Sequence, residues 1–247
     1  MLVRLAWLLL TLTLLLPVPA AAAAGLTVAA AANFMRPLQE IIHIFEKRFY
    51  INVEPTFAST GKLYSQVMAG APYDLYLAAD EASPRRLYEQ GLATLPVVYG
   101  RGQVVLWTAK PDLCRAAGWQ EIFGLPQVKR VAIANPETAP YGAAARTALE
   151  AAGLWNPLQP RLVFAQSIAQ AFQYASTESA DVAFCALSEA LSEPGRQGCY
   201  WTLPEAPPVV QALVVLKGSA NQKLARQLAA FVNSPEAQEV KRKYGYQ

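Results

Sequence analysis

The sequence is poor in the side chains that many enzymes and metal sites use. Its 247 residues include one histidine, His43, together with three cysteines and three methionines. One histidine is too few for a histidine-based zinc site, and no motif links His43 to the partners of a Ser-His-Asp triad. His43 lies between Ile42 and Ile44 in a helical pattern. We therefore expect it to be structural or exposed, and we expect no catalytic residue and no cofactor.

The three cysteines, Cys114, Cys185 and Cys199, cannot all pair within one chain. A disulfide between Cys185 and Cys199 is one possibility, since an exported protein permits disulfides. Cys185 lies in an apolar run and can equally be a buried free thiol. The sequence leaves both alternatives open.

Charge of either sign is also sparse. The chain has 21 Lys and Arg against 18 Asp and Glu, a formal charge of +3. These residues are scattered, and the small cluster Lys241 to Lys243 is typical of a solvated helix end. We expect neither nucleic acid nor a membrane surface as a partner.

The one long apolar run lies at the N-terminus. A basic start that includes Arg4 precedes a leucine-rich core, and the small residues Ala20 to Ala24 follow. This order is typical of a secretory signal peptide, and the core is too short for a permanent membrane span. We predict a signal peptide over residues 1–24 and a soluble periplasmic product, with a signal anchor as the alternative.

Strand-like and helical patterns alternate along the rest of the chain, which favours parallel sheets with helices on their faces, an α/β fold. The expected strands are 26–31, 51–57, 74–79, 103–108, 131–134, 161–165, 181–187 and 209–216. Helical patterns follow Asn33, Thr60, Pro140 and Ser167, and two more begin at Asn221 and Ser234. The stretch from Pro194 to Pro208 is interpreted as an exposed excursion before the last strand.

The stretch FASTGKLYSQ, residues 57–66, resembles the end of a phosphate-binding loop. A Walker A loop needs a glycine five residues before Gly61 and a Ser or Thr after Lys62, but Thr56 and Leu63 occupy these positions. What remains is a helix start, whose first N–H groups have no partner in the helix and favour an anion. A plain N-cap is the simpler interpretation of one such start.

The same arrangement occurs at four strand ends, which are Ala32-Asn33, Ser59-Thr60, Pro140-Tyr141 and Ser167-Ile168. Four helix starts in a cleft between two lobes can hold a small anion without arginine. About five charge-assisted hydrogen bonds, each worth about 1.5–3 kcal/mol, supply enough for tight binding. We expect Lys62 to point to solvent. A pocket with donors and no carboxylate disfavours phosphate, which carries protons near neutral pH.

Several segments together resemble one family. In order they are AAANF, FASTGKL, GAPYDLYLAADE, NPETAPYG, DVAFCALSEA and a closing KYGY. Their order and spacing resemble the periplasmic molybdate-binding proteins of ABC transporters over essentially the whole mature chain. The resemblance implies a type II periplasmic binding protein fold, with two α/β lobes and a ligand cleft between them. We expect lobe one to combine 25–104 with 211–247, and lobe two to cover 105–210.

The resemblance also implies the ligand groups. Matched motif by motif, it assigns an amide and a side-chain donor to Asn33, a hydroxyl and an amide to Thr60, and backbone amides to Tyr141 and Ile168. Ala32 and Ser59 are lesser candidates. Some relatives have threonine where this chain has Ala32, and one branch has a tyrosine where this chain has Ala186, so those hydroxyl donors are missing here.

On this resemblance the chain is expected to be a receptor that captures molybdate, and tungstate as well, and delivers it to a membrane permease of an ABC transporter. It would act as a monomer, without chemistry of its own and without direct metal ligands. A receptor for sulfate or another tetrahedral oxyanion is the nearest alternative. A secreted hydrolase with Ser59 or Cys185 as nucleophile is a distant one.

Overall fold

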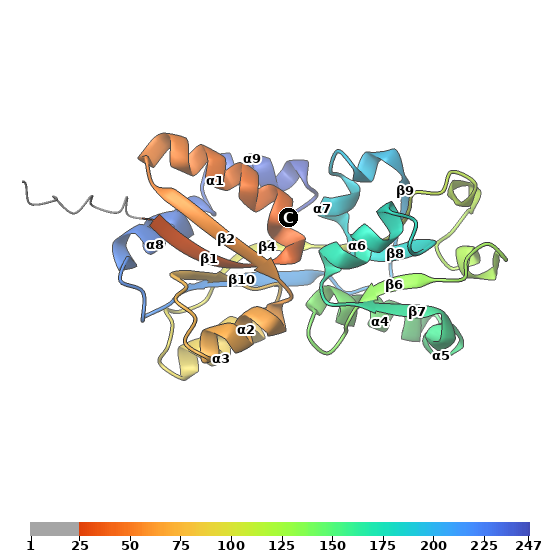
Figure 1. Cartoon of the computed structure of the whole chain (residues 1–247), viewed down its shortest axis with the longest axis horizontal. Coiled ribbons are helices and arrows are strands. Elements are labelled where there is room, and N and C mark those ends of the chain that lie inside the picture. The colour runs from red at the N-terminus through yellow and green to blue at the C-terminus, as the bar shows by residue number, and fades with distance from the viewer. Residues whose placement is uncertain (1–24) are drawn as a thin grey trace, which may run out of the picture.

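The protein folds into two α/β lobes that lie side by side (Figure 1), which confirms the expected fold class. The computed structural model describes residues 25–247, and the predicted signal peptide lies outside the described residues. Each lobe is built on a five-stranded sheet with helices on its faces. No helix in residues 25–247 is both long and apolar enough to span a membrane.

Lobe one contains the sheet with strand order β2-β1-β3-β10-β4. Strand β1 is parallel to β2 and β3, whereas β10 is antiparallel to β3 and β4. The strands are β1 (Gly25–Ala31), β2 (Asn52–Ala58), β3 (Leu75–Leu77), β4 (Val97–Gly102) and β10 (Val209–Val215). The helices are η1 (Ala32–Phe34), α1 (Met35–Phe49), α2 (Thr60–Met68), α3 (Ala82–Glu89), α8 (Gln222–Phe231) and α9 (Pro235–Lys243).

Lobe two contains the sheet with strand order β7-β6-β8-β5-β9, in which β6 is parallel to both β7 and β8. The strands are β5 (Val104–Thr108), β6 (Val131–Ala134), β7 (Leu162–Ala165), β8 (Val182–Ala186) and β9 (Cys199–Thr202). The α-helices are α4 (Pro140–Ala151), α5 (Trp155–Leu158), α6 (Ile168–Ser176) and α7 (Leu187–Ala190). Four 3-10 turns complete it: η2 (Leu113–Arg115), η3 (Glu121–Gly124), η4 (Gln159–Arg161) and η5 (Gly195–Gln197).

The helices form where the apolar spacing places one face against a sheet. In α1, Leu38, Ile41 and Phe45 follow the helical period, and all three are fully buried in the core of lobe one. Helix α2 ends just before Gly70, the residue that follows its C-cap. Gly70 has a φ of 82°, a backbone conformation that glycine adopts without strain.

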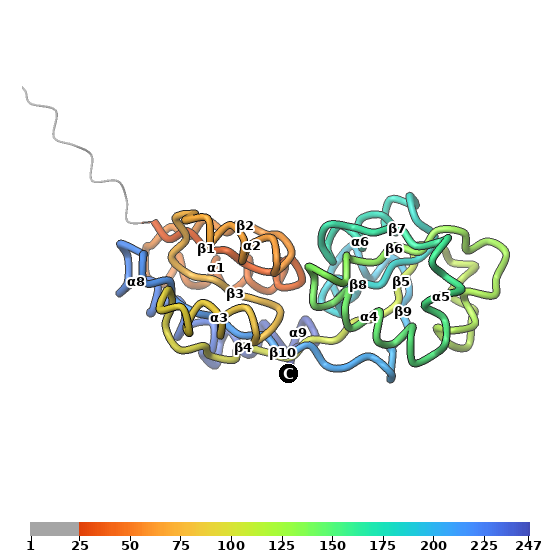
Figure 2. Tube along the Cα trace, turned by 90° about the horizontal axis from the view of Figure 1, so that it is seen from below, coloured from red at the N-terminus to blue at the C-terminus, as the bar shows by residue number. Residues whose placement is uncertain are grey.

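The chain passes between the lobes twice, from β4 to β5 and from β9 to β10. Figure 2 shows both connections at the lower edge of the molecule, beside α9 and the C-terminus. The last residue, Gln247, exchanges backbone hydrogen bonds with Arg101 of β4. Two short connections at one edge are the usual construction of a hinge.

All eight expected strands occur, with ends that differ by at most two residues. Strands β4 and β9 were not predicted. Strand β9 lies inside the stretch 194–208, so that stretch is not an excursion from the sheet, although all of its residues except Gly195 and Leu203 are exposed or half-buried. It pairs with β5 from Val105↔Thr202 to Thr108↔Cys199 and forms the edge of the sheet.

The disulfide joins Cys114 to Cys199, and Cys185 is a buried free thiol. Of the two alternatives that the sequence leaves open, the buried free thiol is therefore confirmed and the disulfide between Cys185 and Cys199 is wrong. The sheet explains why, because Cys185 in β8 and Cys199 in β9 lie on opposite sides of β5. Strands two positions apart are separated by roughly 9–10 Å, beyond the reach of a disulfide.

Candidate functional site

Four helix starts line one small cavity between the lobes. Its wall includes all six residues expected from the sequence, namely Ala32, Asn33, Ser59, Thr60, Tyr141 and Ile168. The first four come from η1 and the start of α2 in lobe one, and the last two from α4 and α6 in lobe two. Five small or apolar residues complete it: Ala31, Ala58, Ala79, Ala139 and Pro140.

The parallel strands explain why these starts meet. Strands β1 and β2 run in the same direction and lead into η1 and α2, while β6 and β7 do the same before α4 and α6. The carboxyl ends of parallel strands lie at one edge of a sheet, which is where ligands bind in open α/β sheets. Each lobe turns this edge toward the other.

The backbone N–H groups of Asn33, Thr60, Tyr141 and Ile168 belong to first turns, where no carbonyl precedes them in the helix. No backbone hydrogen bond outside the helices and strands of residues 25–247 uses any of these four N–H groups. They are free to donate to a ligand in the cavity, and the helix dipoles favour a negative charge there.

Thr60 also offers a hydroxyl group. Its Oγ1 accepts from the N–H of Ala79 at 2.9 Å, and the residue is only 1% exposed. Since that bond uses a lone pair, the hydroxyl hydrogen can still be donated. Ser59 is the N-cap of α2, and its side chain makes no capping hydrogen bond.

The side chain of Asn33 is used within the protein. Its Nδ2 donates to Gln211 Oε1 at 2.7 Å and to Tyr246 Oη at 2.9 Å. These two bonds account for both hydrogens of the amide. The side-chain donor expected from the sequence is therefore engaged in this structure, which leaves the backbone N–H as the donor that Asn33 can offer in the cavity wall.

Neither Gly61 nor Lys62 lines the cavity. The N–H of Gly61 donates across the cleft to the carbonyl of Thr138 at 3.0 Å. A side chain at position 61 would meet that carbonyl at 3.1 Å, so glycine permits the close approach. Lys62 is exposed, as expected.

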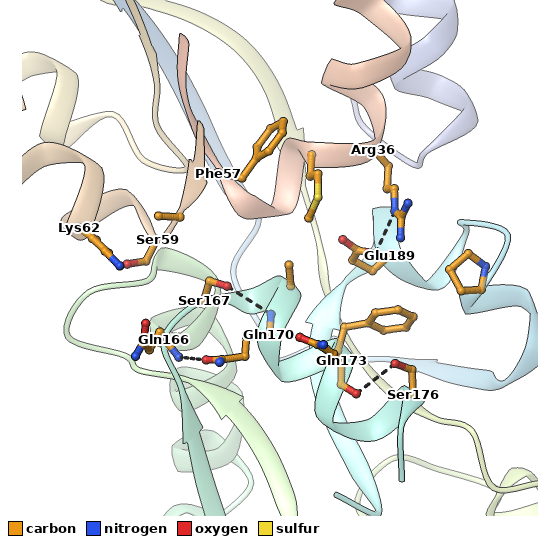
Figure 3. A pocket seen from close by; sticks show the side chains of 15 residues that line it. Arg36, Phe57, Ser59, Lys62, Gln166, Ser167, Gln170, Gln173, Ser176 and Glu189 are labelled. Carbon is orange, nitrogen blue, oxygen red and sulfur yellow. Dashed lines mark hydrogen bonds and ion pairs between the residues drawn. The ribbon is translucent and has the colours of Figure 1, made fainter. Parts of the chain in front are cut away.

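The cavity adjoins a larger pocket at the cleft entrance, which we call the mouth pocket. Figure 3 shows Ser59 and Lys62 on one side of it, Ser167 and Gln170 on the other, and Arg36 facing Glu189. The mouth pocket measures about 500 Å³ and the cavity about 10 Å³, close to the room for one water. A tetrahedral oxyanion is larger than one water, so it needs more room between the lobes than the cavity has in this conformation.

No ionisable side chain other than Tyr141 lines the cavity. Burial raises the pKa of Tyr141 well above its ordinary value, so its hydroxyl is neutral. A charge pair lies at the mouth pocket, where Arg36 Nε is 3.7 Å from Glu189 Oε2. Burial raises the pKa of the Glu189 carboxyl, and Arg36 opposes this effect. A neutral pocket of hydrogen-bond donors results.

The structure offers little for nucleophilic or metal chemistry. Cys185 is fully buried in β8, and burial raises the pKa of its thiol, which disfavours the reactive thiolate. His43 is exposed on α1. Across residues 25–247 no group of three or more His, Cys, Asp or Glu side chains is placed to hold a metal ion.

Sequence reasoning missed the polar side chains beneath the cavity. Gln211 is fully buried in the strand VVQALVV, and it joins Asn33, Tyr141 and Tyr99 by hydrogen bonds. Tyr246 donates to the carbonyl of Asn33 at 2.9 Å. A lone glutamine inside an apolar strand was the signal that could have identified Gln211, because a buried amide needs partners.

Comparison with known proteins identifies the family of the chain. A family model described as bacterial extracellular solute-binding protein matches residues 26–247. The chain is 37% identical over 222 residues to the molybdate-binding protein ModA of Rhodobacter capsulatus, covering 88% of this chain and 86% of that protein. It is 38% identical over 224 residues to the ModA of Azotobacter vinelandii, covering 89% and 88%.

A solved structure gives the same result for the fold. The periplasmic molybdate-binding protein of Azotobacter vinelandii superimposes with a TM-score of 0.85 at 33% identity, covering 90% of this chain and 98% of that one. The similarity therefore includes both lobes and the cleft between them.

Proposed function

This chain belongs to the bacterial extracellular solute-binding proteins, and we propose that it captures molybdate, and tungstate as a close analogue, in the cavity between its lobes. The observation that carries the proposal is the convergence of four helix starts on a cavity without a carboxylate or a cation. Two relatives of more than a third identity are named molybdate-binding proteins.

In this proposal the ligand is held by the N–H groups of Asn33, Thr60, Tyr141 and Ile168 and by the hydroxyl of Thr60, with Ser59 and Ala32 as minor contributors. The oxygens of molybdate and tungstate carry no protons near neutral pH, so an all-donor pocket suits them. Phosphate keeps a proton that needs an acceptor, and the cavity wall has no carboxylate to provide one.

We further propose that the lobes close over the ligand by a hinge motion between lobe one, residues 25–104 and 211–247, and lobe two, residues 105–210. The ligand stabilises the closed form because its donors come from both lobes. The closed protein, a periplasmic monomer, would then dock on a membrane permease of an ABC transporter.

Isothermal titration calorimetry of the mature protein with molybdate, tungstate, sulfate and phosphate tests the proposal. We expect tight binding of the first two, with weak or absent binding of phosphate. Tight sulfate binding without a molybdate signal would instead support a sulfate receptor, which requires the same donors in a cavity of smaller radius.

A further inference from the structure

Tyr141 carries two groups that act in different lobes. Its backbone N–H belongs to the first turn of α4 in lobe two, and the residue lines the cavity. Its side chain leaves lobe two, and its hydroxyl accepts from Gln211 Nε2 at 3.0 Å, while Asn33 Nδ2 lies 3.4 Å from it. Gln211 lies in β10 and Asn33 in η1, both in lobe one. The contact therefore crosses the cleft.

Gly102 in lobe one leaves the space that the Tyr141 hydroxyl occupies. A Cβ atom on Gly102, at the end of β4, would lie 1.9 Å from Tyr141 Oη and 2.8 Å from Gln211 Nε2. The hydroxyl therefore has room only because residue 102 has no side chain. Gly102 stands at the connection between β4 and β5, so the contact is made beside the hinge.

The contact is closed to water. Tyr141 is 2% exposed, Asn33 1% and Gln211 0%. When the lobes separate, the Tyr141 hydroxyl leaves lobe one and the amide of Gln211 loses an acceptor. Buried hydrogen bonds of this kind favour the state in which both groups are paired.

We propose that the side chain of Tyr141, held by Gln211 against Gly102, is an interlobe clasp that stabilises the closed form and slows release of the oxyanion. The inference rests on the proposed oxyanion-binding function. Tyr141 is thus a positioning residue as well as a ligand residue, because the same residue fixes a donor N–H and ties its helix to lobe one.

The clasp affects the dissociation rate of the oxyanion more than its association rate. Ligand enters while the lobes are apart, before the hydroxyl reaches Gln211, so the association rate does not depend on the bond. Other contacts also join the lobes, among them the hydrogen bonds from Ser188 Oγ to the carbonyl of Asn33 at 2.7 Å and from the N–H of Gly61 to Thr138, and the ion pair of Arg36 with Glu189. Loss of the clasp therefore weakens closure without abolishing it.

The test is the release of radioactive molybdate, chased with excess unlabelled molybdate, together with the association rate. Tyr141→Phe keeps the backbone donor and the ring. We expect it to release the ligand roughly 5- to 30-fold faster, the factor for a loss of about 1–2 kcal/mol. Association should change by less than about threefold.

Gly102→Ala should also speed release, because its methyl group would collide with the hydroxyl. The double variant Tyr141→Phe/Gly102→Ala removes the oxygen nearest to that methyl group and so the most severe collision, so it should release more slowly than Gly102→Ala alone. Additive effects of the two mutations would contradict the clasp.

Tyr99→Phe is the matched control. Tyr99 also has a buried hydroxyl that bonds Gln211, at 2.8 Å, and the carbonyl of Ala78, but both partners lie in lobe one. This variant should lower the melting temperature and leave release within about twofold of the wild type.

The outcomes separate the two proposals. Wild-type protein that binds no molybdate overturns the proposed function, and the clasp with it. Wild-type protein that binds molybdate while Tyr141→Phe and Gly102→Ala release it at the wild-type rate overturns the clasp alone. Faster release from Tyr99→Phe equal to that from Tyr141→Phe would also overturn it, since a general loss of packing would then explain both.

Discussion

Thr60 provides the sharpest test of a site built from neutral donors. Its Oγ1 accepts from the N–H of Ala79 at 2.9 Å, and its remaining hydrogen is available to the cavity. Thr60→Val keeps the shape of the side chain and the backbone N–H but removes the hydroxyl. A hydrogen bond to a charged partner is worth about 1.5–3 kcal/mol, so molybdate affinity should fall roughly 10- to 150-fold.

The same substitution has a second effect that must be measured separately. Ala79 is 2% exposed, and its N–H would lose its acceptor. An unsatisfied buried donor costs about 1–3 kcal/mol, which lowers the melting temperature by roughly 2–12 °C for a chain of this length. Melting without ligand measures this effect, and calorimetry well below the melting temperature measures affinity.

Two controls complete the design. Thr60→Ser keeps the hydroxyl and should bind within a few-fold of the wild type, since a hydroxyl can make both bonds. Lys62→Ala removes an exposed cation at the mouth pocket and should change affinity far less than Thr60→Val. If Lys62→Ala weakened binding more than Thr60→Val, the neutral-donor account would be refuted.

Two further predictions concern stability. Burial raises the pKa of the Asp181 carboxyl, but hydrogen bonds from Lys110 and the N–H groups of Arg130 and Lys129 outweigh this and lower it. Asp181→Asn should therefore lower the free energy of unfolding by about 1–3 kcal/mol at neutral pH. This difference from the wild type should shrink as the pH falls through the depressed pKa, as denaturant unfolding over a pH series would show. A difference that stays constant with pH would contradict the prediction. Replacing both Cys114 and Cys199 by serine opens a disulfide with a sequence separation of 85 residues and should cost about 2–4 kcal/mol by the same measurement. Molybdate affinity should not change, because neither cysteine lines the cavity; weaker binding would show that the disulfide also shapes the site.

The helix starts could be predicted from sequence because each depends on local signals. Apolar strands followed by small or hydroxyl residues fix where a helix begins, and parallel strands bring such starts to one edge of a sheet. All six expected residues line one cavity for this reason. The order of strands and helices along the chain then assigns each helix start to a lobe.

The remaining features depend on contacts between distant residues. Strand β9 has only four residues, and its pairing with β5 and the disulfide to Cys114 follow from the register of the finished sheet. The bonds from Asn33 to Gln211 and Tyr246 span 178 and 213 residues. No local pattern around Asn33 indicates that its side chain is used inside lobe one, so the sequence suggested a ligand donor instead.

The most direct test of the site is a crystal structure of the protein grown with molybdate and measured at an energy where molybdenum scatters anomalously. We predict one strong anomalous peak in the cavity between the lobes, within hydrogen-bond reach of the N–H groups of Asn33, Tyr141 and Ile168 and of the Thr60 hydroxyl. A peak in the mouth pocket between Arg36 and Lys62, with the cavity empty, would contradict the account.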